Sequence, residues 1–202
     1  MEQAKQYEYV DLGLPSGLKW AKCNIGAETE TDYGDYFMWG STRPNTADEC
    51  TWEHAPFNDG NTSYNADAIN SARDAVCPNG VLAKEYDAAV QIMGSDWRMP
   101  TKDDFQELID YTNNEWISNY NGTGVNGRKF TSKTNGNSIF IPASGYRLGS
   151  SFRGQGRGGD VWSSSVNTAL PGGALELGFG SVSIYMGDSG RYYGLVVRGV
   201  MD

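Results

Sequence analysis

Residues 97–109 read WRMPTKDDFQELI, and this stretch carries the clearest structural signal in the chain. Thr101 suits the N-cap of a helix, and Asp104 stands three residues later, close to a capping-box arrangement. Pro100 keeps the preceding backbone extended, so the helix cannot start earlier. The apolar positions then recur at helical spacing, at Phe105, Leu108, Ile109 and Thr112. The stretch therefore predicts an amphipathic helix that begins after Thr101 and buries one face.

The N-terminal residues predict short strands joined by turns. Residues 7–10 and 18–21 have the composition and alternation of strands, and a Pro-Ser-Gly turn lies between them. Residues 33–40 are densely aromatic, which favours a segment packed in the core.

Residues 41–80 are polar, rich in Asn and Pro, and poorly periodic. A stretch of this kind predicts a long, loop-rich insertion, and loops of this length in compact domains are commonly functional or weakly ordered. We expect a short helix within it, near Asn65–Val76. Tyr86–Met93 follows with helical spacing and predicts a helix that packs through Tyr86, Ala89, Val90 and Met93.

The chain changes character after residue 120. Eighteen of its 26 glycines lie from Gly122 onward, and turns of Gly, Ser and Asn separate short runs of β-forming residues. These runs are Phe130, Ile139–Ile141, Val161–Trp162, Ala174–Phe179, Val182–Tyr185 and Leu195–Val197. Strands, two helices and then several short strands predict one α+β domain over residues 1–202, with a small antiparallel sheet and long Gly-rich loops.

The chain is acidic, with 16 Lys and Arg against 25 Asp and Glu and a net charge of −9. A protein that neutralises many phosphates needs a basic face, so nucleic acid is not an expected partner. Residues 1–127 carry a net charge of −13, whereas residues 128–202 carry +4. We interpret the second part as a near-neutral loop surface on an acidic scaffold, with a functional basic patch as the alternative.

The sequence predicts no membrane-spanning segment and no signal peptide. No stretch approaches the roughly 18 apolar residues that cross a bilayer. Residues 1–20 carry three acidic side chains and lack the apolar core of a signal peptide. Met1 is either a natural start or a replacement for a leader, which leaves the compartment open. A cell-surface or extracellular location is favoured if a leader was removed, and a cytoplasmic or phage-associated one otherwise.

The residues that hydrolases and zinc sites require are scarce. His54 is the only histidine, so a Ser–His or Cys–His system has no other histidine base. Cys23, Cys50 and Cys77 form no Cys-x-x-Cys motif, which argues against zinc. An odd count cannot be a complete disulfide framework, so we expect buried or idle thiols, with one disulfide open if the protein is exported.

Three further patterns have simpler explanations than chemistry. Residues 154–159 match G-x-G-x-x-G, but no helical period follows, which favours a loop over a dinucleotide site. Asp103 and Asp104 form a carboxylate pair that the first turn of a helix explains. Asp59, Asn65 and Asp67 lack EF-hand spacing. We therefore expect no catalytic residue, no metal site and no cofactor, with an incidental metal ion left open.

Several segments, taken in order over nearly the whole chain, resemble the "Fibrobacter succinogenes major paralogous" domain family, which is abundant in gut Bacteroidetes. The segments are Tyr9–Ala21 with Cys23–Ala27, Tyr33–Trp39, Trp97–Thr101, Ile141–Ala143 with Gly145–Arg147, Trp162–Ser165, and Gly194–Arg198. Their joint occurrence makes the resemblance specific, although each alone would be weak. Gly199 departs from the family, which usually has Pro at this position.

The resemblance implies a C-type-lectin-like fold of the formylglycine-generating-enzyme type. Those enzymes use a pair of cysteines in their C-terminal region, and no cysteine follows Cys77 here. The resemblance therefore implies the fold without the activity. It also implies kinship with the variable proteins of diversity-generating retroelements, in which reverse transcription rewrites codons near the C-terminus and the fold displays the altered residues.

Residues 145–198 are the expected ligand-display region. Tyr and Trp give large contact area at low entropic cost, whereas Ser and Gly adapt, and recognition loops favour these types. We interpret Tyr146 and Trp162 as core. The expected contact residues are Leu148, Arg153, Gln155, Arg157, Asp160, Leu170, Glu176, Tyr185, Met186, Asp188, Tyr192 and Tyr193.

In the family, many positions of this region are Asn, whose codons adenine-directed mutagenesis rewrites. Here those positions hold mixed residues, as in a diversified copy: Leu148, Arg153, Gly172, Gly173, Gly178, Gly180 and Ser189. The leading hypothesis is a non-catalytic binding domain that displays these loops to a protein or glycan. The alternatives are an undiversified cell-surface domain, structural or glycan-adhering, and an oxidase of the formylglycine-generating type.

Overall fold

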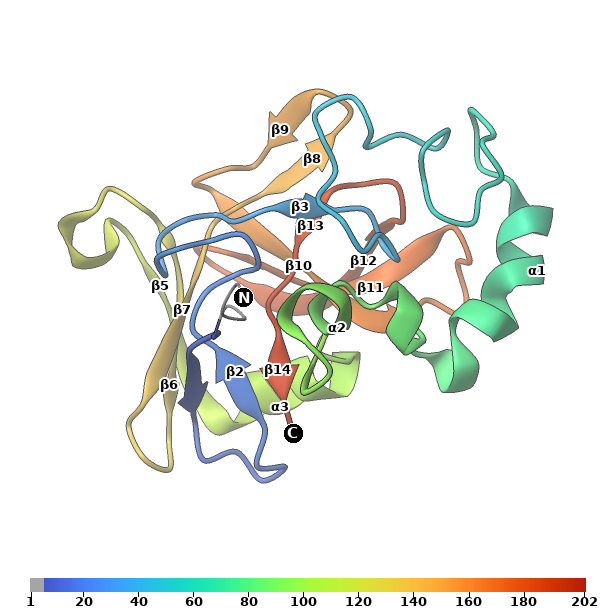
Figure 1. Ribbon diagram of the computed structural model, residues 1–202. Coiled ribbons are helices and arrows are strands. Elements are labelled where there is room, and N and C mark those ends of the chain that lie inside the picture. The colour runs from blue at the N-terminus through green and yellow to red at the C-terminus, as the bar shows by residue number, and fades with distance from the viewer. Residues whose placement is uncertain (1–5) are drawn as a thin grey trace, which may run out of the picture.

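A computed structural model describes residues 6–202, which fold as an α+β protein (Figure 1). The helices are α1 (Ala66–Val76), α2 (Ala88–Met93) and α3 (Lys102–Tyr111). Short 3-10 turns occupy Pro78–Gly80, Lys84–Tyr86 and Tyr120–Gly122. Residues 1–5, which belong to the segment expected to lack a signal peptide, lie outside the described residues. No helix in the described part is long and apolar enough to cross a bilayer.

The strands are short and gather in four sheets. In chain order they are β1 (Tyr9–Asp11), β2 (Lys19–Ala21), β3 (Tyr36–Phe37), β4 (Trp97–Arg98), β5 (Thr112–Ile117), β6 (Gly127–Ser132), β7 (Ser138–Pro142), β8 (Tyr146–Leu148), β9 (Ser151–Arg153), β10 (Gly158–Val166), β11 (Gly173–Gly180), β12 (Ile184–Gly190), β13 (Leu195–Val196) and β14 (Val200–Met201).

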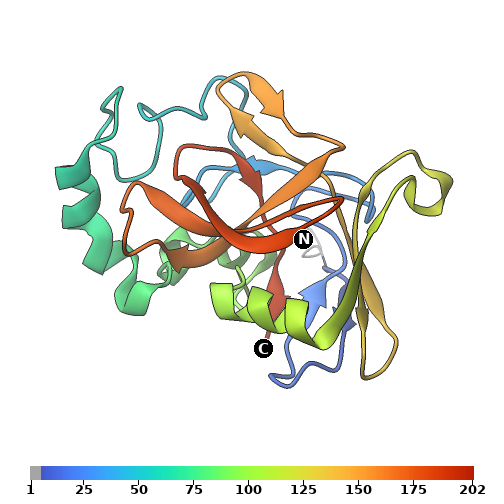
Figure 2. The same cartoon turned by 180° about the vertical axis from the view of Figure 1, so that it is seen from behind.

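Helix α3 begins where the capping pattern predicts. The amide of Asp104 donates to the hydroxyl of Thr101 at 3.2 Å, and the carboxylate of Asp104 accepts from the amide of Thr101 at 2.7 Å. Arg98, on β4, donates to the same carboxylate at 2.6 Å. Phe105 and Leu108 are fully buried, and α3 packs along β10, β11 and β12 (Figure 2). The local sequence thus fixes both the start of the helix and the face it buries.

The prediction that the helical stripe includes Thr112 is wrong. Helix α3 ends at Tyr111, and Thr112 opens β5 with extended backbone. The Thr112 hydroxyl donates to the carbonyl of Leu108 at 2.6 Å. Thr112 is therefore buried as expected, but it closes the last turn of the helix and does not extend it.

The largest sheet has the strand order β12-β11-β10-β13-β3. Strand β11 pairs antiparallel with both β10 and β12. Strands β10 and β13 pair in parallel through Val161 and Val196. Four of its five strands come from the C-terminal third of the chain. The expected small antiparallel sheet is therefore present, with one parallel pairing added.

A second sheet joins the two ends of the described chain, in the order β1-β2-β14-β4. Trp20 on β2 faces Val10 on one side and Val200 on the other. Arg198, just before β14, is completely buried and donates to Asn24 at 2.8 Å and to the carbonyl of Ala21 at 2.9 Å. These contacts fix the chain ends to the core.

The remaining strands form the three-stranded sheet β5-β6-β7 and the hairpin β8–β9. The apolar runs at Phe130 and Ile139–Ile141 predict β6 and β7, and both are present. Strand β5 and the hairpin β8–β9 are not evident from local sequence, because their residues are largely polar and their order comes from pairing.

The polar insertion at residues 41–80 contains α1, close to its expected position, which makes three helices among the described residues in place of the expected two. Asn65 caps α1 through its side-chain oxygen. Asn58 is fully buried and donates to the carbonyls of Trp52 at 2.8 Å and Asn61 at 2.9 Å. A buried amide therefore organises a loop whose polar sequence has no regular period.

Candidate functional site

The expected contact residues lie in three parts of the molecule. Strands β8 and β9 and the following turn carry Leu148, Arg153, Gln155 and Arg157. Strands β10–β12 carry Asp160, Glu176, Tyr185, Met186 and Asp188. Loops carry Leu170, Tyr192 and Tyr193. The structure therefore spreads these residues over one sheet, its connecting loops and a hairpin.

Strand register separates the side chains of β10–β12 into two faces. Asp160 pairs with Gly178, which pairs with Tyr185, so these three share one face. The next cross-strand pair, Leu177 and Met186, points to the opposite side, where Leu177 is buried in the core next to α3. Met186 therefore packs into the fold, whereas Tyr185 is 51% exposed.

Two glycines form the floor beneath the Tyr185 ring. A Cβ atom on Gly178 would lie 2.7 Å from this ring, and one on Gly187 would lie 2.9 Å from it. Glu176 Oε1 lies 3.6 Å from the same Cβ position above Gly187. The missing side chains let the tyrosine ring lie against the sheet, beside the carboxylate of Glu176.

Asp160 and Glu176, the acidic pair, share this face two residues apart in cross-strand register. Glu176 is only 4% exposed, and its Oε2 has no hydrogen-bond partner. Burial raises the pKa of Glu176 to about 8, with a further contribution from the charge of Asp160. Burial also raises the pKa of Asp160 to about 6. Neither carboxylate forms an ion pair among residues 6–202.

A chain of aromatic rings, the aromatic row, runs beside this face. Its members in order are Tyr64, Trp52, Tyr192, Tyr193 and Tyr146. Trp52 lies 5.3 Å from Tyr64 and 4.5 Å from Tyr192, measured between ring centroids. Tyr193 lies 4.6 Å from Tyr192 and stacks on Tyr146 at 5.1 Å. The row joins the polar insertion to the C-terminal loops.

Sequence reasoning placed Tyr192 and Tyr193 at the ligand surface and missed Trp52 and Tyr64. These two are aromatic residues within an otherwise polar loop, and this contrast is the signal that could have found them. Tyr146, interpreted as core, is half-buried and ends the row. Trp162, also interpreted as core, is fully buried.

A shallow, mainly apolar groove of about 420 Å³ lies at the Tyr64 end of the aromatic row. Its lining residues are Trp52, Tyr64, Leu170, Pro171, Gly172, Gly173, Asp188 and Gly190. Leu170 is an exposed apolar side chain, with 58% of its surface open to solvent. Two expected contact residues, Leu170 and Asp188, therefore meet two aromatic residues of the insertion at one surface.

The β8–β9 hairpin carries a separate group of side chains. Arg147 stacks over the ring of Phe152 at 4.4 Å, and Phe152 is 44% exposed. Gln155 donates from Nε2 to the Tyr36 hydroxyl at 2.9 Å, which in turn donates to the carbonyl of Ser144 at 2.7 Å. Gln155, Arg153 and Arg157 are all exposed, and Gln155 is held in place by its bond to Tyr36.

A buried arginine supports the loop that carries Tyr192. Arg191 is 1% exposed, lies over the Trp39 ring at 4.5 Å and donates to the carbonyl of Gly173 at 3.3 Å. The sequence offers no local signal for this burial, because Arg191 stands next to Gly and Tyr in a loop. The contact fixes the loop against β11 and so positions the aromatic row.

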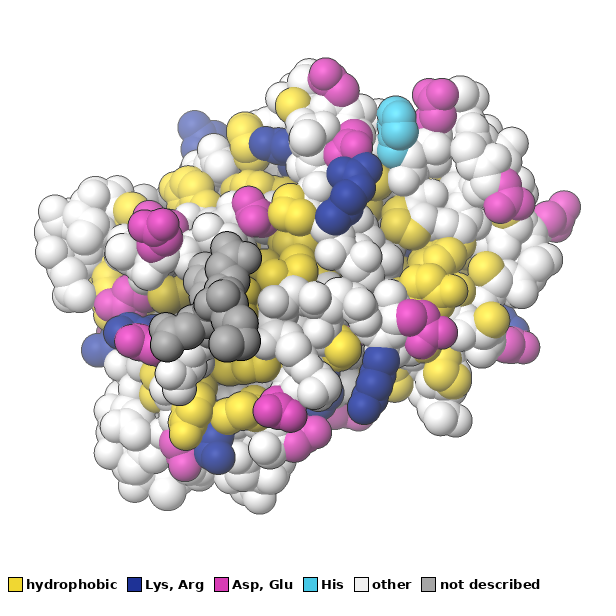
Figure 3. All heavy atoms as spheres, viewed as in Figure 1, with side chains coloured by type: hydrophobic (Ala, Val, Ile, Leu, Met, Phe, Trp, Pro, Cys, Tyr) yellow, Lys and Arg dark blue, Asp and Glu magenta, His cyan; other side chains and the backbone are white. Residues whose placement is uncertain are grey.

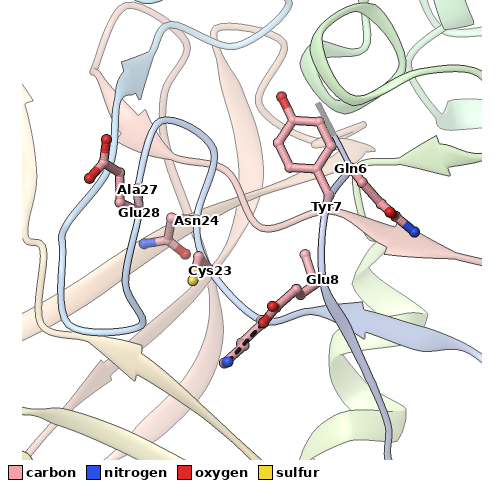
Figure 4. Close-up of a pocket in the computed structure, with 9 residues that line it drawn as sticks. Gln6, Tyr7, Glu8, Cys23, Asn24, Ala27 and Glu28 are labelled. Atoms are coloured by element: carbon pink, nitrogen blue, oxygen red, sulfur yellow. Dashed lines mark hydrogen bonds and ion pairs between the residues drawn. The ribbon is translucent and has the colours of Figure 1, made fainter. Parts of the chain in front are cut away.

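Figure 4 shows a different hollow, of about 300 Å³, near the N-terminal strands. The ion pair between Lys22 and Glu8 lies at its edge, at 2.8 Å. Cys23 also lines it, and burial raises the pKa of this thiol, which disfavours the nucleophilic thiolate. None of the expected contact residues lies there.

The groups considered for catalysis lie apart. His54 is on the surface of the insertion and contacts Thr51 at 3.0 Å (Figure 3). Cys23, Cys50 and Cys77 are free thiols, and burial raises the pKa of both Cys50 and Cys77 to about 11. No group of three or more His, Cys, Asp or Glu in the described residues could hold a metal ion.

No family model, no curated protein and no solved structure matches the chain.

Proposed function

We propose that the chain is a non-catalytic binding domain that contacts a protein or glycan through the aromatic row and the adjoining face of β10–β12. The observation that carries this proposal is the continuity of five aromatic rings from Tyr64 to Tyr146. Aromatic rings give large contact areas at little conformational cost, and they dominate binding hot spots. The row ends in an apolar groove that is open to the ligand.

The shape of this surface favours contact over catalysis. The groove is shallow, and a buried arginine and a buried asparagine support the two loop segments that carry Tyr192 and Trp52. A catalytic site would combine an enclosed pocket with a nucleophile and a matched base. The free thiols carry raised pKa values, and the single histidine stands alone.

We further propose a C-type-lectin-like fold and a role as a diversified display protein. The order of elements supports the fold, since early strands and helices precede a sheet built mostly from the C-terminal third. Four of the seven positions suggested as rewritten codons lie at this surface, whereas Leu148 and Arg153 lie on the separate β8–β9 hairpin. Gly178 and Ser189 are on the strands beside the acidic pair, and Gly172 and Gly173 line the groove. A template repeat and a reverse-transcriptase gene beside this gene are the expected genomic signs.

Two alternative functions can be distinguished from this proposal by experiment. An undiversified adhesion domain would use the same surface but would lack both genomic signs. An oxidase of the formylglycine-generating type would require a cysteine pair in the C-terminal region, and Cys77 is the last cysteine. Copper-dependent oxidation of a cysteine peptide by the purified chain would overturn the binding proposal.

The proposal is tested by ligand screening with matched tyrosine variants. Wild type, Tyr192→Ala and Tyr111→Ala are compared on a glycan array and against purified surface proteins. Tyr192 belongs to the aromatic row, whereas Tyr111 is an exposed tyrosine at the end of α3. We expect Tyr192→Ala to weaken binding by about tenfold or more and Tyr111→Ala to leave it unchanged. Equal binding by all three proteins would place the contact surface elsewhere.

A further inference from the structure

Glu176 is an ionisable side chain that the fold buries without a counter-ion. Its Oε2 has no hydrogen-bond partner, and only 4% of the residue is exposed. Placing an unpaired carboxyl in such a position costs stability unless another group satisfies it. The three buried arginines of the described residues donate to other groups: Arg128 to Asn114, Arg191 to the carbonyl of Gly173 and Arg198 to Asn24. Glu176 forms no ion pair among residues 6–202, so a cation from outside the chain would supply its counter-charge.

The surroundings of Glu176 suit a positive charge. Asp160 lies on the same face and contributes a second carboxylate. The Tyr185 ring lies beside Glu176 Oε1 over the bare surface of Gly187, and half of the Tyr185 side chain is open to solvent. A cation that entered here would meet two carboxylates and the edge or face of an aromatic ring.

We propose that the acidic pair and Tyr185 form a subsite for the side-chain ammonium of a lysine on a protein partner. A metal ion fits less well, because no group of three or more carboxylate, histidine or cysteine side chains gathers in the described residues. An ammonium is compact and carries three donors, which suits two carboxylates and the nearby Ser189 hydroxyl. This inference deepens the proposed function, on which it rests for the identity of the binding face.

The burial of Glu176 limits which cationic groups can reach its carboxylate. A lysine ammonium stands at the end of a slender, flexible four-carbon stem, so it can reach a carboxylate that is almost wholly buried. The ammonium of an amino sugar is attached directly to a ring, which is much bulkier than the lysine stem. A guanidinium is broader and planar. The geometry therefore points to a protein partner and to lysine.

The test uses small probes and the whole chain. Amide spectra are recorded near pH 8, the pKa of Glu176, while Nα-acetyl-lysine methylamide is added. The norleucine analogue, which has a methyl group in place of the charge, is the probe control. We expect the amides of Gly178 and Gly187 to shift with lysine and to stay unchanged with norleucine, since both glycines lie under the Tyr185 ring.

Two variants localise the effect. Glu176→Gln keeps the shape of the side chain, and its amide spectrum reports directly whether it is folded. We expect it to bind the lysine probe about tenfold more weakly, the loss expected for one charged hydrogen bond. Glu115→Gln, at an exposed position of β5 in another sheet, should bind as wild type does.

Several outcomes would overturn the inference. Equal amide shifts with the lysine and norleucine probes would show that the positive charge is not recognised. Undiminished binding of the lysine probe by Glu176→Gln would show that the Glu176 carboxylate does not bind it. Glucosamine that shifts both glycine amides while lysine does not would assign the cation to a glycan. An arginine probe that binds as tightly as lysine would refute the choice of ammonium. None of these measurements needs the natural partner. They test the lysine subsite, whereas the ligand screen with Tyr192→Ala tests the proposed binding surface, so the two proposals can fail independently.

Discussion

Burial raises the pKa of Glu176 to about 8 from an ordinary value of 4.5. Below pH 4.5 the folded and unfolded chains both hold this proton, and the group has no effect on stability. Between about pH 4.5 and pH 8 the unfolded chain loses the proton while the folded chain keeps it, so stability falls as pH rises. Asp160, with its pKa raised to about 6, acts in the same direction at lower pH.

Glu176→Gln should therefore stabilise the protein at pH 8. The change removes an ionisable group from a buried position and keeps its volume. We expect a gain of at least about 1 kcal/mol, which corresponds to a rise of about 2–4 °C in Tm. Thermal melts at pH 8 and below pH 4.5 measure the effect. A gain of equal size at both pH values would contradict an electrostatic origin.

Gly145 is the glycine of the display region with the least room. Its φ is +58°, and a Cβ atom there would meet the carbonyl oxygen of Arg153 and lie 2.6 Å from the backbone nitrogen of Gln155. Gly145→Ala should cost about 3 kcal/mol or more, because neither backbone contact can move without shifting the hairpin. Denaturant unfolding measures the loss.

Gly149 is the matched control in the same hairpin. Its φ is +53°, but nothing lies within 4 Å of the position that a Cβ would take. Gly149→Ala should cost only the backbone strain, about 1 kcal/mol. Losses of equal size in the two variants would show that crowding at Gly145 contributes nothing.

At the scale of an element, α3 depends on one carboxylate for several contacts. Asp104 accepts from the amide of Thr101 at 2.7 Å and from Arg98 at 2.6 Å. Asp104→Asn weakens the cap and the ion pair together, and we expect a loss of about 1–2 kcal/mol. Its exposed neighbour gives the comparison, since Asp103→Asn should change stability by less than about 0.5 kcal/mol. Unfolding curves of both variants decide whether the capping box or general charge stabilises the helix.

The same element shows what local sequence can predict. The start of α3 follows from Thr101, Asp104 and Pro100, which are adjacent in the chain, so short-range rules suffice. Its end does not, because Thr112 enters β5 through pairing with Ser132. The helix α1 lies close to its expected position, and its Asn65 cap is visible in the structure, whereas the polar strands β5, β8 and β9 acquire their structure only from neighbours.

At the scale of the whole molecule, the reactivity of the three thiols should measure how well the folded core excludes reagents. Cys50 and Cys77 are buried and carry pKa values raised to about 11, whereas Cys23 is half-exposed. A maleimide should label Cys23 in the native protein and reach Cys50 and Cys77 only through unfolding. Peptide mapping after timed labelling measures the three rates. Similar rates for all three in the absence of denaturant would contradict a closed core.

The candidate site was predictable only in part at this scale. The composition of residues 145–198 identified Tyr185, Tyr192 and Tyr193 as surface aromatics. Trp52 and Tyr192 are far apart in the sequence, and their contact depends on the turn that Asn58 stabilises. No local sequence pattern could therefore predict it. The depth of Glu176 depends likewise on the register of three strands and on a tyrosine lying over two glycines.

The sheet that joins the chain ends has a mechanical consequence. Strands β1 and β14 both pair antiparallel with β2 and therefore run in the same direction, with Tyr9 level with Ala21 and Met201 level with Lys19. The two ends of the described chain thus leave this sheet at opposite ends of β2. Tension applied to both ends would slide β1 and β14 along β2 and load all their backbone hydrogen bonds together, instead of peeling them apart one by one. A domain arranged in this way resists deformation when it is pulled from its ends, which would keep the proposed binding surface intact under load.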